Sequence, residues 1–119
     1  MGIQRRTAGS GVTVLQINGE YFGGDETDRL REAILAEAAS GNTRLLLDLT
    51  GCGRMNSNAL SVMVEAHQSY VARRAEMKLC GLQKQMISYL VMTRLIDVFS
   101  HYPSEAEALA AFGPGSVPA

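Results

Sequence analysis

One serine hydroxyl, that of Ser57, stands where a strand pattern changes into a helical pattern. Residues 45–47 are apolar at consecutive positions, as in a strand covered on both faces, and glycines at positions 51 and 53 then indicate a turn. Apolar residues recur at helical spacing from position 60 to position 71. Asn56 or Ser57 is therefore predicted to cap a helix. A hydroxyl at this place is exposed among unpaired backbone N–H groups, where an added phosphate is electrostatically tolerated.

Two interpretations of Ser57 follow from its position. It can be a helix cap, a role that contributes about 0.5–2 kcal/mol to the fold, or it can be a site of regulatory phosphorylation. If Asn56 is the cap instead, Met55 and Leu60 occupy the two positions of a hydrophobic staple.

Other residues capable of chemistry lack partners at useful spacing. Cys52 and Cys80 are too far apart for a metal pair, and Cys80 ends a strand pattern, so we interpret it as a small buried hydrophobe. His67 falls on an apolar helical stripe and is interpreted as a packed side chain. Asp48, at the end of the central strand, is expected at the surface or as a loop cap. No second catalytic side chain is placed with Asp48 by the sequence, and no phosphate-binding glycine pattern occurs, so we expect no enzyme activity and no cofactor. The spacing of the cysteines and carboxylates predicts no metal site.

The composition is that of one small globular domain. The chain has 119 residues, of which 46% are hydrophobic and 19% charged, and its formal net charge is −1. This charge gives no reason to expect nucleic acid as a partner, and the two Arg-Arg pairs at 5–6 and 73–74 are interpreted as solvated surface. No secretory signal or membrane-length apolar run is visible, so we expect a cytoplasmic protein without a membrane partner.

Strand-like and helix-like segments alternate along the chain, which predicts an α/β fold with a mostly parallel sheet. The expected strands are 12–18, 43–49, 77–80 and a short one within 97–102, and the expected helices are 25–40, 57–74, 83–93 and 105–112. Residues 1–11 form a loose lead-in or an edge strand, residues 12–112 the domain, and residues 113–119 a flexible tail.

The second helix is expected to present two different faces. Leu60, Met63, Val64, His67 and Val71 should face the sheet, and the opposite stripe holds Asn58, Ser61, Glu65, Gln68 and Ala72. That stripe is mildly polar near its start, so a partner can cover it without a large desolvation cost.

The order of several segments resembles the STAS family, the domains of anti-sigma factor antagonists and of the cytosolic tails of sulfate transporters. Residues 56–60 (Asn-Ser-Asn-Ala-Leu) match the family's Asp-Ser-x-Gly-Leu turn before a helix, and Asn56 and Ala59 depart from it. Residues 17–20, 79–82 and 95–99 continue the resemblance, which covers roughly 12–112. It implies a four- to five-stranded, mixed but mostly parallel sheet, with about four helices mainly on one side.

The resemblance also implies a function, that of a bacterial anti-sigma factor antagonist which works by partner switching. The unmodified domain, a monomer or weak dimer, would bind an anti-sigma factor with serine kinase activity and so release a sigma factor. The kinase would phosphorylate Ser57, and a phosphatase would reset the switch. Two alternatives stay open. Asn56, which stands where the family has Asp, favours a scaffold of a stressosome-type complex that is not phosphorylated. Some STAS domains are proposed to bind small molecules or nucleotides, so a sensing module is the second alternative.

The family places part of its partner-binding surface in the loop at residues 20–24 and around the serine. The residues expected to bind the partner are Glu20, Tyr21, Phe22, Gly23, Asn56, Asn58 and Ser61. The two aromatic rings in the loop look exposed and would anchor an interface, or one of them packs on the core.

Overall fold

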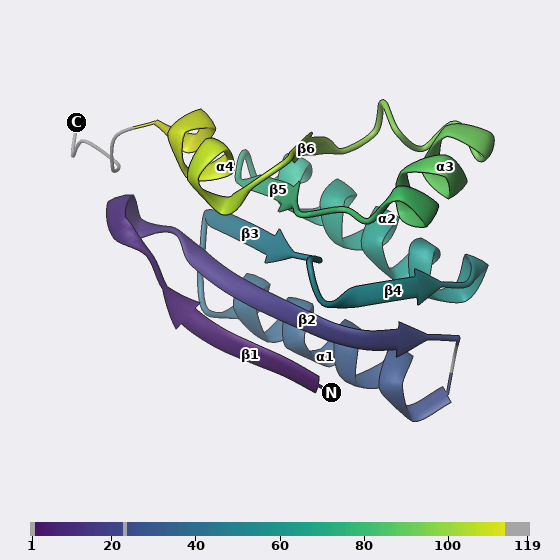
Figure 1. Cartoon of the computed structure of the whole chain (residues 1–119). Coiled ribbons are helices and arrows are strands. Elements are labelled where there is room, and N and C mark those ends of the chain that lie inside the picture. Colours follow the sequence, from purple (N-terminus) through teal and green to yellow (C-terminus); the bar gives the residue numbers. More distant parts are fainter. Residues whose placement is uncertain (1, 23, 114–119) are drawn as a thin grey trace.

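Six strands form one mixed sheet in the computed structural model of the chain, which describes residues 2–22 and 24–113 (Figure 1). The sheet order is β1-β2-β3-β5-β6, and β4 pairs with the far end of β2. Only the β1–β2 pair is antiparallel among the described strands. The strands are β1 (Gly2–Thr7), β2 (Thr13–Tyr21), β3 (Arg44–Asp48), β4 (Cys52–Met55), β5 (Glu76–Cys80) and β6 (Ser100–Tyr102).

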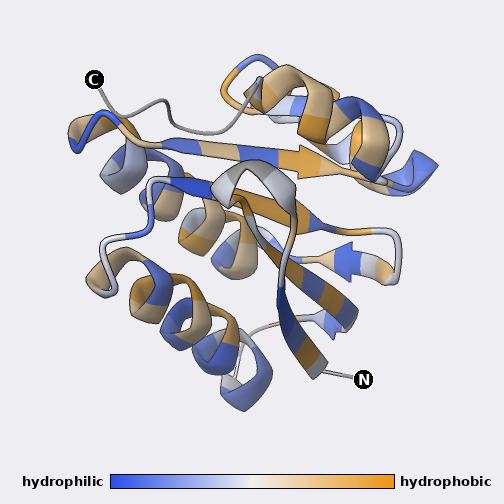
Figure 2. Cartoon of the chain, turned by 90° about the vertical axis from the view of Figure 1, so that its left-hand side faces the viewer, coloured by the Kyte–Doolittle hydropathy of each residue, from blue (hydrophilic) through white to orange (hydrophobic). Residues whose placement is uncertain are grey.

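Helices cover both faces of this sheet. The helices α1 (Gly24–Ala39), α2 (Ser57–Ala72) and α3 (Lys84–Met92) pack on one face, and α4 (Glu105–Phe112) packs on the other; a short 3₁₀ turn, η1 (Gly9–Gly11), joins β1 to β2. On α1, Leu30 and Ile34 are buried in the core whereas Leu35 is exposed, and Figure 2 shows both hydrophobic and hydrophilic residues along the helices. None of the helices in the described ranges combines the length and the hydropathy that crossing a membrane requires. The predicted α/β class, with helices mainly on one side, is confirmed.

The central strand β3 is buried on both faces, as its sequence predicts. Leu45 and Leu47 belong to the large hydrophobic cluster under α1, α2 and α3, whereas Leu46 belongs to the smaller cluster under α4. All three side chains are fully buried. Consecutive leucines therefore serve two cores, one on each side of the sheet.

The sheet has six strands, whereas four to five were expected. The additional strand is β4, which forms although glycines at positions 51 and 53 indicated a turn. β4 lies beside the end of β2, with a register shift between Gly19 and Glu20. Gly19 adopts φ 107°, a conformation that favours glycine, and its N–H donates to the carbonyl of Gly51 at 3.0 Å. The expected end of this strand at position 18 is therefore wrong: β2 passes through a bulge and continues to Tyr21.

Of the two alternatives for the aromatic rings at 21 and 22, the structure shows that one ring packs on the core, that of Tyr21, so its expected role in partner binding is corrected. Tyr21 ends β2, is only 3% exposed, and donates its hydroxyl to the carbonyl of Asn18 at 2.8 Å. One expectation for α2 is also corrected. On α2, Tyr70 rather than Val71 enters the core, and Val71 is 59% exposed. The polar stripe opposite is exposed as predicted.

The ends of the chain are described in part. Of the two alternatives for residues 1–11, the edge strand is the one observed, as β1. Gly113 ends α4, and residues 114–119 of the expected tail lie outside the described residues.

Candidate functional site

Asn56 caps α2 and ties the start of that helix to the end of β2. Its side-chain Oδ1 accepts the N–H of Ala59 at 3.0 Å, and its own N–H donates to the carbonyl of Tyr21 at 2.8 Å. The Asn56 carbonyl accepts the N–H of Leu60 at 3.0 Å, the first hydrogen bond of the helix. Of the two cap candidates, the structure assigns the role to Asn56.

Ser57 follows as the first helical residue and is exposed. Its hydroxyl makes no hydrogen bond to any described residue, while its carbonyl accepts the hydroxyl of Ser61 at 2.9 Å. The N–H groups of Ser57 and Asn58 precede the first intrahelical bond, so they are available as donors. The first turn of α2 contains no acidic residue. A phosphate on this hydroxyl would meet a favourable helix dipole and no neighbouring carboxylate in that turn.

Apolar contacts fix the cap from below. Met55 and Leu60, the two staple positions, are each 4% exposed and belong to the same hydrophobic cluster. Ala59 is fully buried, so the methyl group that replaces the family's glycine lies in the core. The start of α2 is therefore held by packing and by the Asn56 side chain, without the Ser57 hydroxyl.

Ser57 lines one of two hollows that share a side chain of α3. Ser57 and Ser61 line the first, of about 400 Å³, together with Tyr89. Phe22 and Arg54 line the second, of about 300 Å³, again with Tyr89. The end of β2, the end of β4, the start of α2 and the side of α3 thus form one continuous surface, which we call the switch surface.

The structure places the expected partner-binding residues as follows. Asn58, Ser61, Glu20 and Phe22 are exposed, Phe22 by 54%, and Asn56 is half-buried. Tyr21 belongs to the core and does not contribute its ring to the switch surface, and Gly23 lies outside the described residues.

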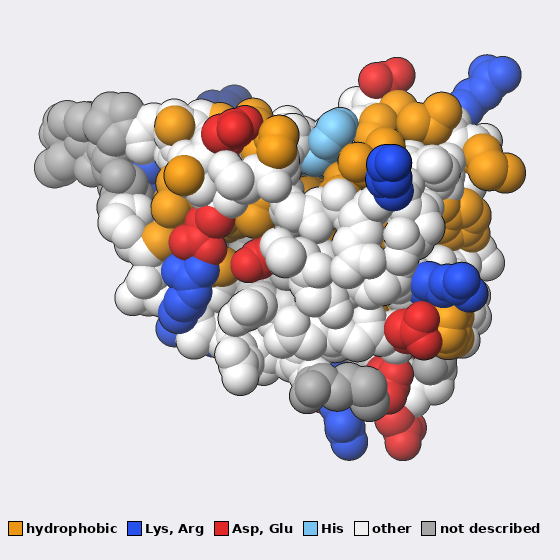
Figure 3. Space-filling view, viewed as in Figure 1, with side chains coloured by type: hydrophobic (Ala, Val, Ile, Leu, Met, Phe, Trp, Pro, Cys, Tyr) orange, Lys and Arg blue, Asp and Glu red, His pale blue; other side chains and the backbone are white. Residues whose placement is uncertain are grey.

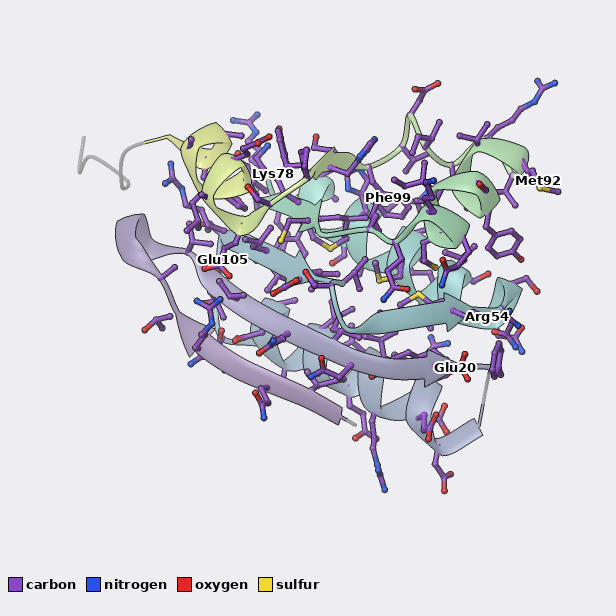
Figure 4. The ribbon with its side chains drawn as sticks, viewed as in Figure 1. Glu20, Arg54, Lys78, Met92, Phe99 and Glu105 are labelled. Carbon is purple, nitrogen blue, oxygen red and sulfur yellow. The ribbon has the colours of Figure 1, made fainter. Side chains whose placement is uncertain are left out.

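Glu20 lies at one edge of the switch surface. It is the register partner of Arg54, and Figure 4 shows both side chains at the same end of the sheet. The negatively charged Glu20 and the positively charged Arg54 therefore lie together at this edge of the switch surface.

Sequence reasoning missed the contribution of α3. The half-buried Tyr89 lines both hollows, and outside them this helix exposes Ile87, Val91 and Met92, by 37%, 55% and 80%. Figure 3 shows hydrophobic side chains gathered over α3, and Figure 4 shows Met92 directed outward from it. A signal was present in the sequence: residues 90–92 are three successive apolar residues, which cannot all face one side of a helix.

The remaining candidates have structural roles. Asp48 is buried, and its Oδ1 accepts the N–H and the hydroxyl of Thr50 at 3.0 and 2.6 Å, so it is a loop cap and not a surface residue. Burial raises the pKa of Cys52 to about 11 and that of Cys80 to about 12, which keeps both thiols protonated. Within the described ranges, no group of three metal-ligating side chains occurs.

His67 is a packed side chain, as predicted. Its ring lies edge-on to Phe99, with 5.5 Å between the ring centroids, and burial lowers its pKa.

Comparisons with known proteins agree on the fold. The family model for the STAS domain matches residues 6–108. No curated protein sequence matches the chain. At these low identities, the following structural likenesses establish the fold alone.

Three similar solved structures are the following. A putative anti-sigma factor antagonist from Thermotoga maritima is 17% identical, with a TM-score of 0.83 and 92% of each chain covered. An anti-sigma factor antagonist from Mycobacterium paratuberculosis is 22% identical, with a TM-score of 0.79 and coverage of 92% of this chain and 91% of that one. The Bacillus cell fate determinant SpoIIAA in its phosphorylated form is 15% identical, with a TM-score of 0.72 and coverage of 93% and 99%.

Proposed function

The chain belongs to the STAS domain family, and we propose that it acts in the bacterial cytoplasm as an anti-sigma factor antagonist that works by partner switching. Unmodified, it binds an anti-sigma factor that is also a serine kinase, and a sigma factor is released. The kinase transfers the terminal phosphoryl group of ATP to the Ser57 oxygen, and ADP and the hydroxyl proton leave. The complex then separates, and a phosphatase hydrolyses the phosphoserine.

The observation that carries this proposal is the hydroxyl of Ser57, which forms no hydrogen bond with any residue that the structure describes. The adjacent Asn56 already satisfies the helix cap, so the fold does not need the serine oxygen. The oxygen is exposed, lies beside two available N–H donors, and is surrounded by a surface that a second protein can cover. One protein of similar fold, SpoIIAA, exists in a phosphorylated and an unphosphorylated form, which supports the same chemistry here.

The phosphate would act on docking and leave the fold intact. It adds about −1.5 to −2 charges, which the start of α2 tolerates because of its dipole and free donors. In a complex, the same charge would lie on the switch surface, in a hollow where Ser57 and Ser61 meet apolar side chains such as Val64. Burying it there without a cationic partner is costly, so the modified domain would dissociate.

The residue type at position 56 affects how fast the phosphoryl group is transferred to Ser57. A carboxylate at this position would accept the hydroxyl proton or orient the oxygen, whereas an amide can only donate and accept hydrogen bonds. We therefore expect Asn56→Asp to speed phosphorylation of Ser57. An unchanged rate would remove this role of the position.

The test is phosphorylation with a defined kinase. The wild-type chain, Ser57→Ala and Ser61→Ala are each incubated with ATP and a purified anti-sigma serine kinase from the same organism, and intact masses are measured. We expect one phosphoryl group on the wild type and on Ser61→Ala, and none on Ser57→Ala. Ser61 is the matched control because it is an exposed serine one turn further along the same helix.

If the chain is a scaffold, it should gain no phosphoryl group in this assay. A second STAS protein that the same kinase phosphorylates in parallel would show that the kinase is active. A scaffold would also elute as a large assembly in size-exclusion chromatography, where a switch component elutes as a monomer or dimer.

A further inference from the structure

A groove between β1 and α1 has no role in the switch surface. Its volume is about 740 Å³, in the range of small-molecule sites, and its lining is mostly apolar. Ile3 and Leu15 contribute from neighbouring strands, and Ala33 and Ala36 contribute from the helix. None of its lining residues lines either hollow of the switch surface. In Figure 1 the two elements that form the groove, β1 and α1, run along the lower edge of the molecule.

The groove stays open because α1 presents small side chains to β1. Ala33 and Ala36 are three residues apart and lie on the same face of the helix, and β1 contributes Gly2 without a side chain. α1 packs more extensively on α2 than on β1, and the ion pair between Arg31 and Glu65 (3.0 Å) links the two helices. Larger side chains also line the groove, among them Ile3 and Arg5 of β1 and Arg29 of α1, and the small residues lie along with them in its wall.

The length of the groove follows from the helix that lines it. Glu26 lies near one end and Glu37 near the other, eleven residues further along α1. At about 1.5 Å per residue this is roughly 16 Å, which accommodates an extended chain of about ten carbons.

The Glu37 end of the groove offers hydrogen-bond donors. The Nε of Arg5 donates to both carboxylate oxygens of Glu37, which is itself buried. The terminal amino groups of Arg5 make no other hydrogen bond to a described residue. The backbone carbonyls of residues 36–38, in the last turn of α1, already accept hydrogen bonds from residues 40–42. This end therefore suits a ligand that brings an acceptor, and a guanidinium edge matches a carboxylate in shape and charge.

We propose that this groove binds a free medium-chain carboxylate. The hydrocarbon chain lies along the alanines and the apolar strand residues, and the carboxylate accepts two hydrogen bonds from the terminal amino groups of Arg5. The proposal goes beyond partner switching and does not rest on phosphorylation of Ser57.

The test uses decanoate as the probe and the full chain as the receptor. Isothermal titration calorimetry should give saturable binding with one site, and amide shifts in ¹H–¹⁵N spectra should map to β1 and α1. Ala36→Leu places a larger side chain in the groove and should weaken binding at least tenfold. Ala39→Leu is the matched control, since Ala39 is exposed on the same helix and does not line the groove, and it should bind as the wild type does.

A second comparison tests the headgroup. Decan-1-ol, which has the same chain without the charge, should bind the wild type at least tenfold more weakly than decanoate does. The double variant Arg5→Gln/Glu37→Gln removes both charges, so neither partner is left unpaired, and it should bind both probes equally.

Three results would overturn the proposal. Amide shifts that map to α3, where other apolar side chains are exposed, would place the probe elsewhere. Equal affinity of Ala36→Leu and the wild type would mean that the groove is not the site. A wild-type dimer in sedimentation that Ala36→Leu dissociates, without decanoate binding, would assign the groove to a second copy of the chain.

Discussion

Replacing Asn56 and Ser57 one at a time separates the residue that holds the helix from the residue available for chemistry. Asn56→Ala removes the 3.0 Å bond to the N–H of Ala59. Loss of an N-cap lowers the free energy of unfolding by about 0.5–2 kcal/mol. Because Ala59 is fully buried, water cannot readily replace the lost hydrogen bond, and we expect a loss of about 1.5 kcal/mol. An unfolding entropy of about 2.1 cal/mol/K per residue gives roughly 0.25 kcal/mol/K for 119 residues, so Tm should fall by about 6 °C.

Ser57→Ala should leave stability within about 0.5 kcal/mol of the wild type, because the exposed hydroxyl bonds to no described residue. Ser104→Ala is a matched control for cap loss, since Ser104 caps α4 through a longer, exposed bond of 3.2 Å to the N–H of Glu107. It should cost less than Asn56→Ala. Urea unfolding followed by circular dichroism measures all three variants. A loss in Ser57→Ala as large as that in Asn56→Ala would refute the division of roles.

Three further predictions concern the core. Gly81→Ala should destabilise the domain by more than about 1 kcal/mol in urea unfolding, because Gly81 has φ +72° and an added Cβ would clash with the neighbouring loop. Since burial raises the pKa of Cys52 to about 11, from an ordinary value of 9.0, its labelling by a maleimide at pH 8 should be about 100-fold slower than that of an ordinary thiol, and that of Cys80 slower still; denaturation in urea should abolish the difference, as mass spectrometry would show. Burial lowers the pKa of His67 below 6.5, so the unfolded chain takes up its proton at higher pH than the folded one. The unfolding free energy should therefore fall as pH drops below about 6.5, and it should fall less steeply in His67→Gln; equal slopes in the two proteins would contradict this role of His67.

Local patterns in the sequence predict the central elements well, because there the local preference and the tertiary environment agree. The leucines of β3 read as a strand buried on both faces, and they are. The helix that starts at Ser57 is found at the predicted position, and Asn56 satisfies the cap that its side-chain type favours.

The missed features depend on contacts between segments far apart in the chain. β4 is a strand only because β2 lies beside it, and the glycines at 51 and 53 give no local sign of that pairing. Tyr21 is buried because β2 continues through the bulge at Gly19, which its sequence reads as a stop. Val71 and Tyr70 are adjacent on α2, and the direction in which the helix docks decides which of them enters the core. Pairing and docking of this kind are tertiary effects that override local propensity.

The separation of cap and hydroxyl bears on how a phosphate would act. At a helix whose serine is itself the cap, phosphorylation would change the group that satisfies the first turn, and folding and docking would change together. In this chain Asn56 holds the N–H of Ala59, so a phosphate on Ser57 leaves that bond in place. The added charge meets two free N–H donors and no carboxylate in the first turn, which stabilises it within the domain. Its unfavourable interactions arise only when a second protein covers the switch surface, and modification would therefore control association while the folded domain persists.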